Sequence, residues 1–356
     1  MKIWEFFLLP LRSKVSKMLD RMPRIVLHIG CEKTGTTSIQ QFLSRERDFL
    51  MSKGILFPRV PAGNASEPNH KLLTLCVRRS NVEDLRATVP DVDTKIEHFL
   101  SDFAAEIAES AYHTIILSNE HCSSRLPELD QIGALKRLLL NFSENIDVIV
   151  YIRRQDKLLW SMYSTSLKSG NVREFVYPND INSPLLNFKT LLDRWSEVFC
   201  VKNIHVRSYD DVILNGGDVV HDFLATAGLA DLFGPLLLGE SVTNRSLDGK
   251  TLEFLRLFNK YVPYLVDGRL NEQRGNIMKC LESISGKDDG PQDEQAGREF
   301  LERFRDSNAY VARKYLGRQN GQAFPEDWGS AASSDRELSV EDAVRIAAHL
   351  WIDNRK

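Results

Sequence analysis

The stretch that decides the fold is IVLHIGCEKTGTTS, residues 25–38. Residues 25–29 form a short apolar run of the kind that makes a buried parallel strand. A turn of small and polar residues follows, and helical sequence begins at Thr36. A strand, a glycine-containing turn and a helix N-terminus together present backbone N–H groups and the positive end of a helix dipole to an anion. Phosphate is therefore the expected ligand of this stretch.

Three later segments repeat the pattern of a short apolar run followed by helical sequence, at residues 114–117, 148–152 and 204–207. Strands that alternate with helices form parallel sheets, because each helix carries the chain back to the start of the next strand. We therefore expect an α/β fold of three layers, with a central parallel sheet flanked by helices and a C-terminal helical cover. The predicted helices cover residues 36–50, 94–110, 129–140, 157–168, 188–198, 251–261, 298–316 and 340–351.

The composition predicts a globular chain with no general affinity for nucleic acid. With 356 residues and 42% hydrophobic content, the chain can fill a substantial core. Its 46 Lys and Arg residues nearly balance its 49 Asp and Glu residues, for a formal charge of -3. Such a balance gives no overall attraction to nucleic acid or to an anionic membrane, so any anion site must be local.

Residues 1–20 are expected to form an amphipathic segment in front of a single domain over 21–356. The apolar patch at residues 4–10 is interrupted by Glu5 and is too short to span a bilayer. It suits either peripheral contact with a membrane surface or a helix packed on the domain or on a partner. The five cysteines are far apart and lack zinc or dithiol spacing, which indicates reduced thiols in a cytoplasmic protein.

The lysine of the turn is displaced relative to nucleotide triphosphatases, whose pattern is G-x-x-x-x-G-K-[ST]. Gly30, Gly35 and Thr37 keep this frame. Thr36 takes the lysine position, and the lysine stands inside the turn at Lys33. There it can reach over a bound anion and neutralise charge that grows on a leaving-group oxygen. The two threonines add hydroxyl donors, and the displaced lysine argues against ordinary ATP hydrolysis.

A second anion site is predicted where the strand at 148–152 ends in Arg153 and Arg154. The next helix carries Ser161, eight residues beyond Arg153. A helix that turns back over the strand end would bring this guanidinium and hydroxyl to one phosphate, because phosphate suits an arginine fork and a short neutral donor. Arg154 is out of register with Arg153 and Ser161. We expect it to support the site or to form an ion pair at the surface.

Residues 28–37 and 153–163 together resemble the two nucleotide motifs of sulfotransferases that use 3′-phosphoadenosine 5′-phosphosulfate (PAPS), especially carbohydrate and bacterial members. The resemblance extends loosely over residues 24–316 and implies a P-loop-like fold. It also implies that PAPS is the co-substrate, that 3′-phosphoadenosine 5′-phosphate (PAP) is the product, and that no metal is required. The residues it assigns to the nucleotide are Lys33, Thr34, Gly35, Thr36 and Thr37 at the 5′-phosphosulfate, and Arg153 and Ser161 at the 3′-phosphate.

Sulfuryl transfer needs a base for the proton of the acceptor hydroxyl and positive charge over the leaving phosphate oxygens. Lys33 is expected to supply this charge. Related sulfotransferases use a Glu or a His as base, in several of them just before the 3′-phosphate strand, which indicates Glu120 or His121. We favour Glu120, because carbohydrate members often use Glu. His70 follows a Pro- and Gly-rich loop at residues 58–68 and is a third candidate, better suited to binding substrate or capping a helix.

The acceptor implied by the resemblance is a hydroxyl on a glycan or glycoconjugate, although a small molecule, a lipid-linked sugar and a protein tyrosine stay open. Two other classes of protein compete with this interpretation. A P-loop NTPase or kinase would use the strand end at Asn119 and Glu120 to hold magnesium. A non-catalytic protein would bind the nucleotide as a scaffold. Nucleotide binding that persists in EDTA and prefers a 3′-phosphate would distinguish a sulfotransferase from the NTPase or kinase. Nucleotide binding without any transfer would favour the scaffold protein.

Overall fold

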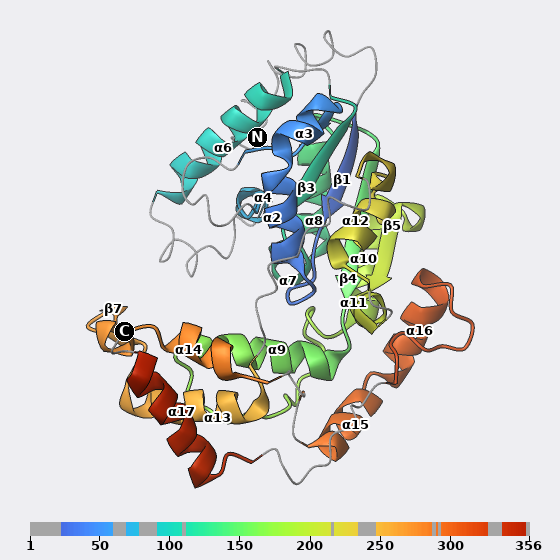
Figure 1. The fold of residues 1–356 in the computed structure, drawn as a ribbon. Coiled ribbons are helices and arrows are strands. Elements are labelled where there is room, and N and C mark those ends of the chain that lie inside the picture. The colour runs from blue at the N-terminus through green and yellow to red at the C-terminus, as the bar shows by residue number, and fades with distance from the viewer. Residues whose placement is uncertain are drawn as a thin grey trace. The chain divides into compact units, whose positions relative to one another are not determined.

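The computed structural model describes residues 23–59, 69–77, 91–108, 112–214, 217–233, 247–286, 290, 293–326 and 337–353 (Figure 1). The chain forms two compact units. The first contains the described parts of Met1–Arg153, Asn182–Ser241 and Ser307–Phe324, and the second those of Arg154–Ile181, Val242–Asp306 and Pro325–Lys356. The N-terminal segment 1–20 and residues 60–68 of the expected loop lie outside the described residues. The single domain expected over 21–356 stays a prediction.

A parallel sheet forms the centre of the first unit. Its strand order is β2-β3-β1-β4-β5, and all four pairings are parallel. The strands are β1 Arg24–His28, β2 Ile55–Leu56, β3 Thr114–Ser118, β4 Ile146–Ile152 and β5 Ile204–Ser208. The four predicted strands are confirmed to within two residues at each end. The edge strand β2 was not predicted, because two residues are too few to carry an apolar pattern.

The register of the central strands brings their carboxyl ends to one edge of the sheet. His28 at the end of β1 pairs with Ser118 of β3 on one side and with Ile149 of β4 on the other. The N–H of Asn119 then donates to the carbonyl of His28 at 2.9 Å, which continues the ladder past the strand ends. The loops after β1, β3 and β4 therefore start side by side, at the edge where open α/β sheets build their sites.

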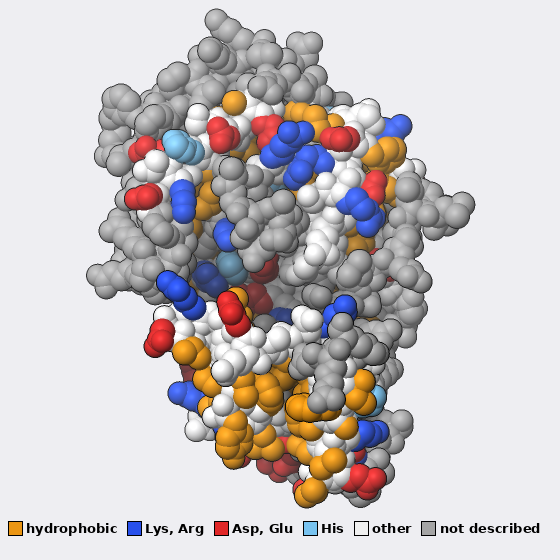
Figure 2. All heavy atoms as spheres, turned by 60° about the vertical axis from the view of Figure 1, so that its left-hand side comes forward, with side chains coloured by type: hydrophobic (Ala, Val, Ile, Leu, Met, Phe, Trp, Pro, Cys, Tyr) orange, Lys and Arg blue, Asp and Glu red, His pale blue; other side chains and the backbone are white. Residues whose placement is uncertain are grey.

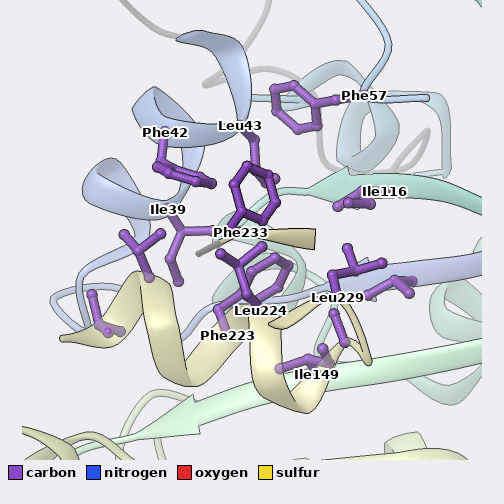
Figure 3. Close-up of a cluster of buried hydrophobic side chains, with 14 of the residues drawn as sticks. Ile39, Phe42, Leu43, Phe57, Ile116, Ile149, Phe223, Leu224, Leu229 and Phe233 are labelled. Atoms are coloured by element: carbon purple, nitrogen blue, oxygen red, sulfur yellow. The ribbon is translucent and has the colours of Figure 1, made fainter. Parts of the chain in front are cut away.

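Helices cover both faces of this sheet, which confirms the three-layer α/β fold (Figure 1). On one face α2 (Thr36–Arg45) and α12 (Val219–Thr226) enclose a core with side chains from β1, β3 and β4. Figure 3 labels ten of its members: Ile39, Phe42, Leu43, Phe57, Ile116, Ile149, Phe223, Leu224, Leu229 and Phe233. Each such buried side chain contributes about 1.5–3 kcal/mol to stability. On the other face α10 (Phe188–Phe199) packs against β4 and β5, and α8 (Leu129–Leu139) packs against α10.

Two predicted helices are broken in the structure. The helix expected at 36–50 ends at Arg45, where the N–H of Glu46 returns to the carbonyl of Phe42, and α3 (Arg47–Ser52) starts immediately afterwards. The helix expected at 298–316 divides into α15 (Glu294–Glu302) and α16 (Arg305–Tyr315). Neither break contains Gly or Pro, so the sequence gives no signal for it. The short helices α4 (Leu72–Val77), α7 (His121–Arg125) and α11 (Tyr209–Leu214) and the longer α6 (Val92–Ala108) complete the main helices of the first unit.

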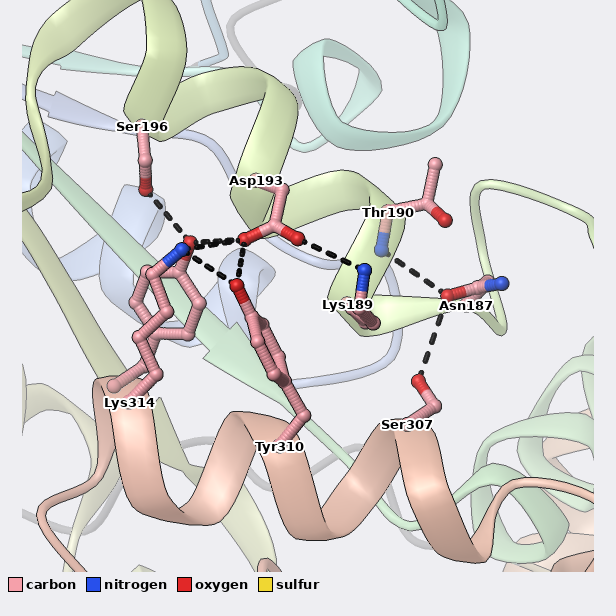
Figure 4. Close-up of polar contacts among 9 residues, drawn as sticks. Asn187, Lys189, Thr190, Asp193, Ser196, Ser307, Tyr310 and Lys314 are labelled. Atoms are coloured by element: carbon pink, nitrogen blue, oxygen red, sulfur yellow. Dashed lines mark hydrogen bonds and ion pairs between the residues drawn. The ribbon is translucent and has the colours of Figure 1, made fainter.

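A cluster around Asp193 attaches α16 to α10 (Figure 4). The Asp193 carboxylate accepts hydrogen bonds from the hydroxyls of Tyr310 and Tyr315, both at 2.8 Å. It also forms ion pairs with Lys314 at 2.8 Å and with Lys189 at 3.2 Å. One carboxylate on α10 thus gathers four donors, three of which lie on α16, and fixes this late helix to the first unit.

The second unit is mainly helical. It contains α9 (Gln155–Lys168), α13 (Gly249–Tyr261), α14 (Ile277–Ile284), α15, α17 (Val340–Asp353) and the two-stranded hairpin β6 (Leu265–Val266) and β7 (Arg269–Leu270). Its core gathers around Trp160, Leu167 and Leu255. Hydrophobic side chains also gather on part of the surface shown in Figure 2, and Tyr261 and Trp351 are among the exposed side chains of this unit. Within the described ranges, no helix is both long and apolar enough to cross a bilayer.

Candidate active site

The loop between β1 and α2, residues 30–35, is held in a fixed shape by backbone hydrogen bonds. The N–H of Cys31 donates to the carbonyl of Tyr151 at 2.7 Å, and the N–H of Tyr151 donates to the carbonyl of Gly30 at 2.6 Å. Inside the loop, the Thr34 hydroxyl donates to the carbonyl of Cys31 at 2.6 Å. The start of the loop therefore extends the pairing between β1 and β4, and the Thr34 side chain is used within the loop.

Both glycines of the loop are required by geometry. Gly30 has φ +92° and Gly35 has φ +79°, a region that residues with a Cβ rarely adopt. A Cβ on Gly30 would lie 2.9 Å from Cα and Cβ of Glu120, and one on Gly35 would lie 2.7 Å from Cγ1 of Val219. The loop thus touches Glu120, two residues after β3, at one end and the first residue of α12 at the other.

The N-terminus of α2 is open to an anion. Its N-cap residue is Gly35, no side chain caps it, and its first turn has no acidic residue. The unsatisfied N–H groups and the helix dipole therefore make it electropositive. Thr37 is exposed at this end, whereas Thr36 is buried. Lys33 stands in the loop with φ 62°, partly exposed.

Arg153, directly after β4, is turned onto the same loop. Its Nη1 donates to the carbonyl of Lys33 at 3.1 Å, and its guanidinium lies 5.3 Å from the centre of the Tyr209 ring. Asp210 Oδ1 is 3.8 Å from Arg153 Nε, too far for a hydrogen bond. Among the described residues Nε is buried and has no hydrogen-bond partner, so part of this guanidinium is available to an anion.

The predicted second motif contains two further residues of interest, Ser161 and Arg154. Ser161 lies on α9 in the second unit, so its pairing with Arg153 stays a prediction. Arg154 is not a surface ion pair. Its Nε and Nη2 donate to the two oxygens of Asp156, each at 2.8 Å, and both side chains are buried. The sequence could not show this, because burial of the pair depends on packing of the second unit.

Glu120 and His121 lie at the end of β3 beside this loop. Glu120 is the residue before α7, and its Oε2 accepts a hydrogen bond from Nε2 of Gln40 at 2.8 Å. The N–H of His121 donates to Oδ1 of Asn119 at 3.1 Å. Burial, followed by the positive charge of Arg125, lowers the pKa of His121 and favours its neutral form. Both candidates for the base are therefore close to the loop, with Glu120 against Gly30.

His70 is completely buried. Its Nδ1 accepts from the N–H of Ser118 at 3.1 Å, and its Nε2 lies 3.2 Å from the carbonyl of Pro58. Burial lowers the pKa of His70 to about 4, so the ring is neutral. Its own carbonyl accepts from the N–H of Leu73 at the start of α4. This geometry favours a structural role, and the expected contact of His70 with substrate stays a prediction.

Sequence reasoning missed three polar residues of this site: His28, Gln40 and Ser118. They are buried where β1, β3 and α2 meet, and Ser118 Oγ lies 2.9 Å from Nδ1 of His28. Burial lowers the pKa of His28 to about 3, so His28 is neutral at physiological pH. The only available signal was the polar character of Gln40 on the apolar face of its helix.

Thiol and metal sites do not add to this arrangement. None of the five cysteines, all of which the structure describes, forms a disulfide, and only Cys200 is exposed. Burial raises the pKa of the Cys31 thiol, inside the loop, to about 12. The part of the chain that the structure describes has no group of three or more His, Cys, Asp or Glu residues that could hold a metal ion. The expectation of metal-independent chemistry stays a prediction.

Comparisons with known proteins give distant similarities. No protein-family model matches the chain. An uncharacterized protein from Archaeoglobus fulgidus is 27% identical over 192 residues, which cover 51% of this chain. The match spans 48% of that relative, about half of its length. Among solved structures, the chain is similar to a sulfotransferase from Alicyclobacillus acidocaldarius, at 14% identity and a TM-score of 0.39, covering 63% of this chain and 88% of that one. It is also similar to the sulfotransferase domain from the curacin biosynthetic pathway, at 11% identity and a TM-score of 0.34. That match covers 93% of this chain and 99% of the other. Because these similarities are distant, we base the function on the geometry of the site.

Proposed function

We propose that this chain is a sulfotransferase that moves a sulfuryl group from PAPS to an acceptor hydroxyl. The observation that carries the proposal is that one loop, residues 30–35, touches both Arg153 and Glu120. An anion-binding helix end, a lysine, an arginine and a carboxylate thus share one edge of the sheet. This set suits transfer of an anionic group to a hydroxyl, which needs both charge stabilisation and a base.

The residues fit the two ends of a doubly phosphorylated adenosine. The loop N–H groups, Thr36, Thr37 and the N-terminus of α2 would hold the 5′-phosphosulfate. Arg153 would hold the 3′-phosphate, and the resemblance of residues 153–163 to the family's 3′-phosphate motif adds Ser161 to this role. The buried Nε of Arg153 supports this role, because a guanidinium nitrogen without a partner is costly until an anion pairs with it.

Two side chains would carry the chemistry. PAPS supplies the sulfuryl group when it is bound. Glu120 takes the proton of the acceptor hydroxyl while the new O–S bond forms. Lys33 neutralises the phosphate oxygen that keeps the electron pair of the broken S–O bond. We extend the proposal to a glycan or glycoconjugate acceptor and to metal-independent transfer, both of which rest on the family resemblance of the two motifs.

The test is transfer of labelled sulfuryl groups from PAPS to extracted cell-envelope glycans, with EDTA present. We expect labelled product with the wild-type chain. Lys33→Ala should lower the rate at least about 100-fold, the scale of removing one charge-stabilising group. Lys53→Ala is the matched control, because Lys53 is an exposed lysine outside the loop, and it should leave the rate unchanged.

Two results would contradict the proposal. Tight, magnesium-dependent binding of ATP in preference to PAPS would indicate a nucleotide triphosphatase or kinase instead. Binding of PAPS and PAP without transfer to any hydroxyl acceptor would indicate a scaffold protein. Transfer that is lost when EDTA is added would keep the sulfotransferase but overturn its independence of metal.

A further inference from the structure

Gln40 is a buried polar residue that the proposed chemistry does not yet use. It lies on α2 among the apolar side chains that face the sheet, and only 4% of it is exposed. Its Nε2 donates to Oε2 of Glu120 at 2.8 Å and to Oγ of Ser118 at 3.1 Å. A buried amide in an apolar setting costs free energy unless its hydrogen bonds are made, so these two bonds fix its place.

The chemistry of the partners fixes the orientation of the amide. An ionised carboxylate only accepts, so the nitrogen of Gln40 must face Glu120. A single amide nitrogen carries two N–H groups and can serve both acceptors at once. Behind it, Ser118 is bonded to His28, whose burial lowers its pKa to about 3 and keeps it neutral. One N–H of Gln40 therefore bonds to Ser118, which is uncharged and bonded to the neutral His28. The other N–H points at the carboxylate of Glu120.

We propose that Gln40 is a positioning residue that holds Glu120 in place for proton transfer, an inference that rests on the proposed function. By binding Oε2, Gln40 leaves Oε1 of Glu120 to take the proton of the acceptor hydroxyl. A glutamate has three rotatable side-chain bonds, and the short helix α7 that follows it does not fix them. The hydrogen bond from α2 ties the base to the same helix whose N-terminus receives the phosphosulfate.

A double-mutant cycle tests this inference. Gln40→Met keeps the size of the side chain and removes both donors, and Glu120→Gln removes the base. Single-turnover transfer is measured for the wild type, both single variants and the double variant. Gln40→Met should slow transfer about 10- to 100-fold in the wild-type background, because a misplaced base loses its productive geometry. It should slow the Glu120→Gln variant less than about 3-fold, since no base is left to position.

Two further variants separate positioning from general damage. Gln41→Met makes the same change on the exposed side of the same helix and should leave the rate within about 2-fold. Affinity for PAP, measured by calorimetry, should stay within about 3-fold in Gln40→Met, because the amide does not touch the anion sites. If Gln40→Met fails to fold, Gln40→Leu takes its place in the cycle, since it also removes both donors and suits the apolar side of α2.

The outcomes divide cleanly. Equal slowing by the Gln40 variant with and without Glu120 would show a merely structural role and overturn the inference. A Glu120→Gln rate equal to wild type would also overturn it, while leaving the sulfotransferase function standing. Absence of transfer by the wild type would instead be the failure of the proposed function itself, seen before any variant is compared.

Discussion

At the scale of a single residue, Arg153 combines a fixed orientation with a buried nitrogen that makes no hydrogen bond. Its Nη1 donates to the carbonyl of Lys33, and its guanidinium lies over the Tyr209 ring. Its Nε is buried without a hydrogen-bond partner, 3.8 Å from Oδ1 of Asp210. Arg154, by contrast, satisfies its Nε and Nη2 with the two oxygens of Asp156. The unused donor and the fixed orientation together favour an anion that arrives from solution.

Replacing Arg153 should weaken binding of the 3′-phosphate and leave binding of the 5′-phosphate unchanged. Arg153→Ala should weaken PAP binding about 10- to 100-fold, the value of a charge-assisted hydrogen bond to phosphate. Affinity for adenosine 5′-phosphate, which has no 3′-phosphate, should change little. Calorimetric titration with both nucleotides measures the difference, with Arg45→Ala as an exposed control. An equal loss of affinity for both nucleotides would show that Arg153 does not bind the 3′-phosphate.

The candidate residues that the sequence could indicate are those whose proposed role follows from their position along the chain. Lys33, Glu120 and Arg153 each follow a strand, and the strand ends of a parallel sheet meet at one edge. Gln40 and Ser118 could not be assigned in this way. Their contact depends on the register of β1 with β3 and on which face of α2 meets the sheet, and both are set by packing. The burial of His70 is likewise a property of the fold and not of its local sequence.

At the scale of elements, the loop at residues 30–35 owes its shape to close packing. Gly30 contacts Glu120, which lies just beyond β3, and Gly35 contacts Val219 at the start of α12. The loop is therefore held between two elements. The strands could be predicted because buried parallel strands are short apolar runs. The breaks at Glu46 and around Arg303 could not, because tertiary packing places them without Gly or Pro.

The same packing gives a prediction for the loop. Gly30→Ala should lower the transfer rate about 10-fold or more, because its Cβ would lie 2.9 Å from the backbone of Glu120 and displace either the base or the loop. The matched control is Gly317→Ala. Gly317 has φ +69° and no atom within 4 Å of an added Cβ, so it introduces the same backbone strain without a clash. In urea unfolding, Gly317→Ala should lose about 1 kcal/mol of stability from strain and Gly30→Ala should lose more because of its clash, and only Gly30→Ala should lose activity. Equal activity in the two variants would contradict this account of the loop.

At the scale of the whole molecule, the chain contributes three segments to the first unit and returns to it for the last time at Ser307. The returning segment carries α16, and the cluster around Asp193 holds it against α10 (Figure 4). Burial raises the pKa of Asp193, but hydrogen bonds from Lys314, Tyr315, Tyr310 and Lys189 outweigh it and lower the pKa to about 2. A carboxylate with a lowered pKa stabilises the folded state only while it is ionised.

Asp193→Asn should therefore destabilise the chain in a pH-dependent way. At pH 7 the loss should be about 2 kcal/mol, because asparagine lacks the negative charge and offers one acceptor oxygen in place of two. The pKa of Asp193 is about 2 in the folded state against 3.8 for a free side chain, so its contribution is complete above the free value and is lost as the pH falls towards the folded one. The difference between variant and wild type should thus shrink below about pH 4. Urea unfolding at pH 7, 5 and 3 measures it, with Glu197→Gln on the exposed side of α10 as control. A difference of the same size at all three pH values would mean that the charge of Asp193 does not hold α16, and that packing alone returns this segment to the first unit.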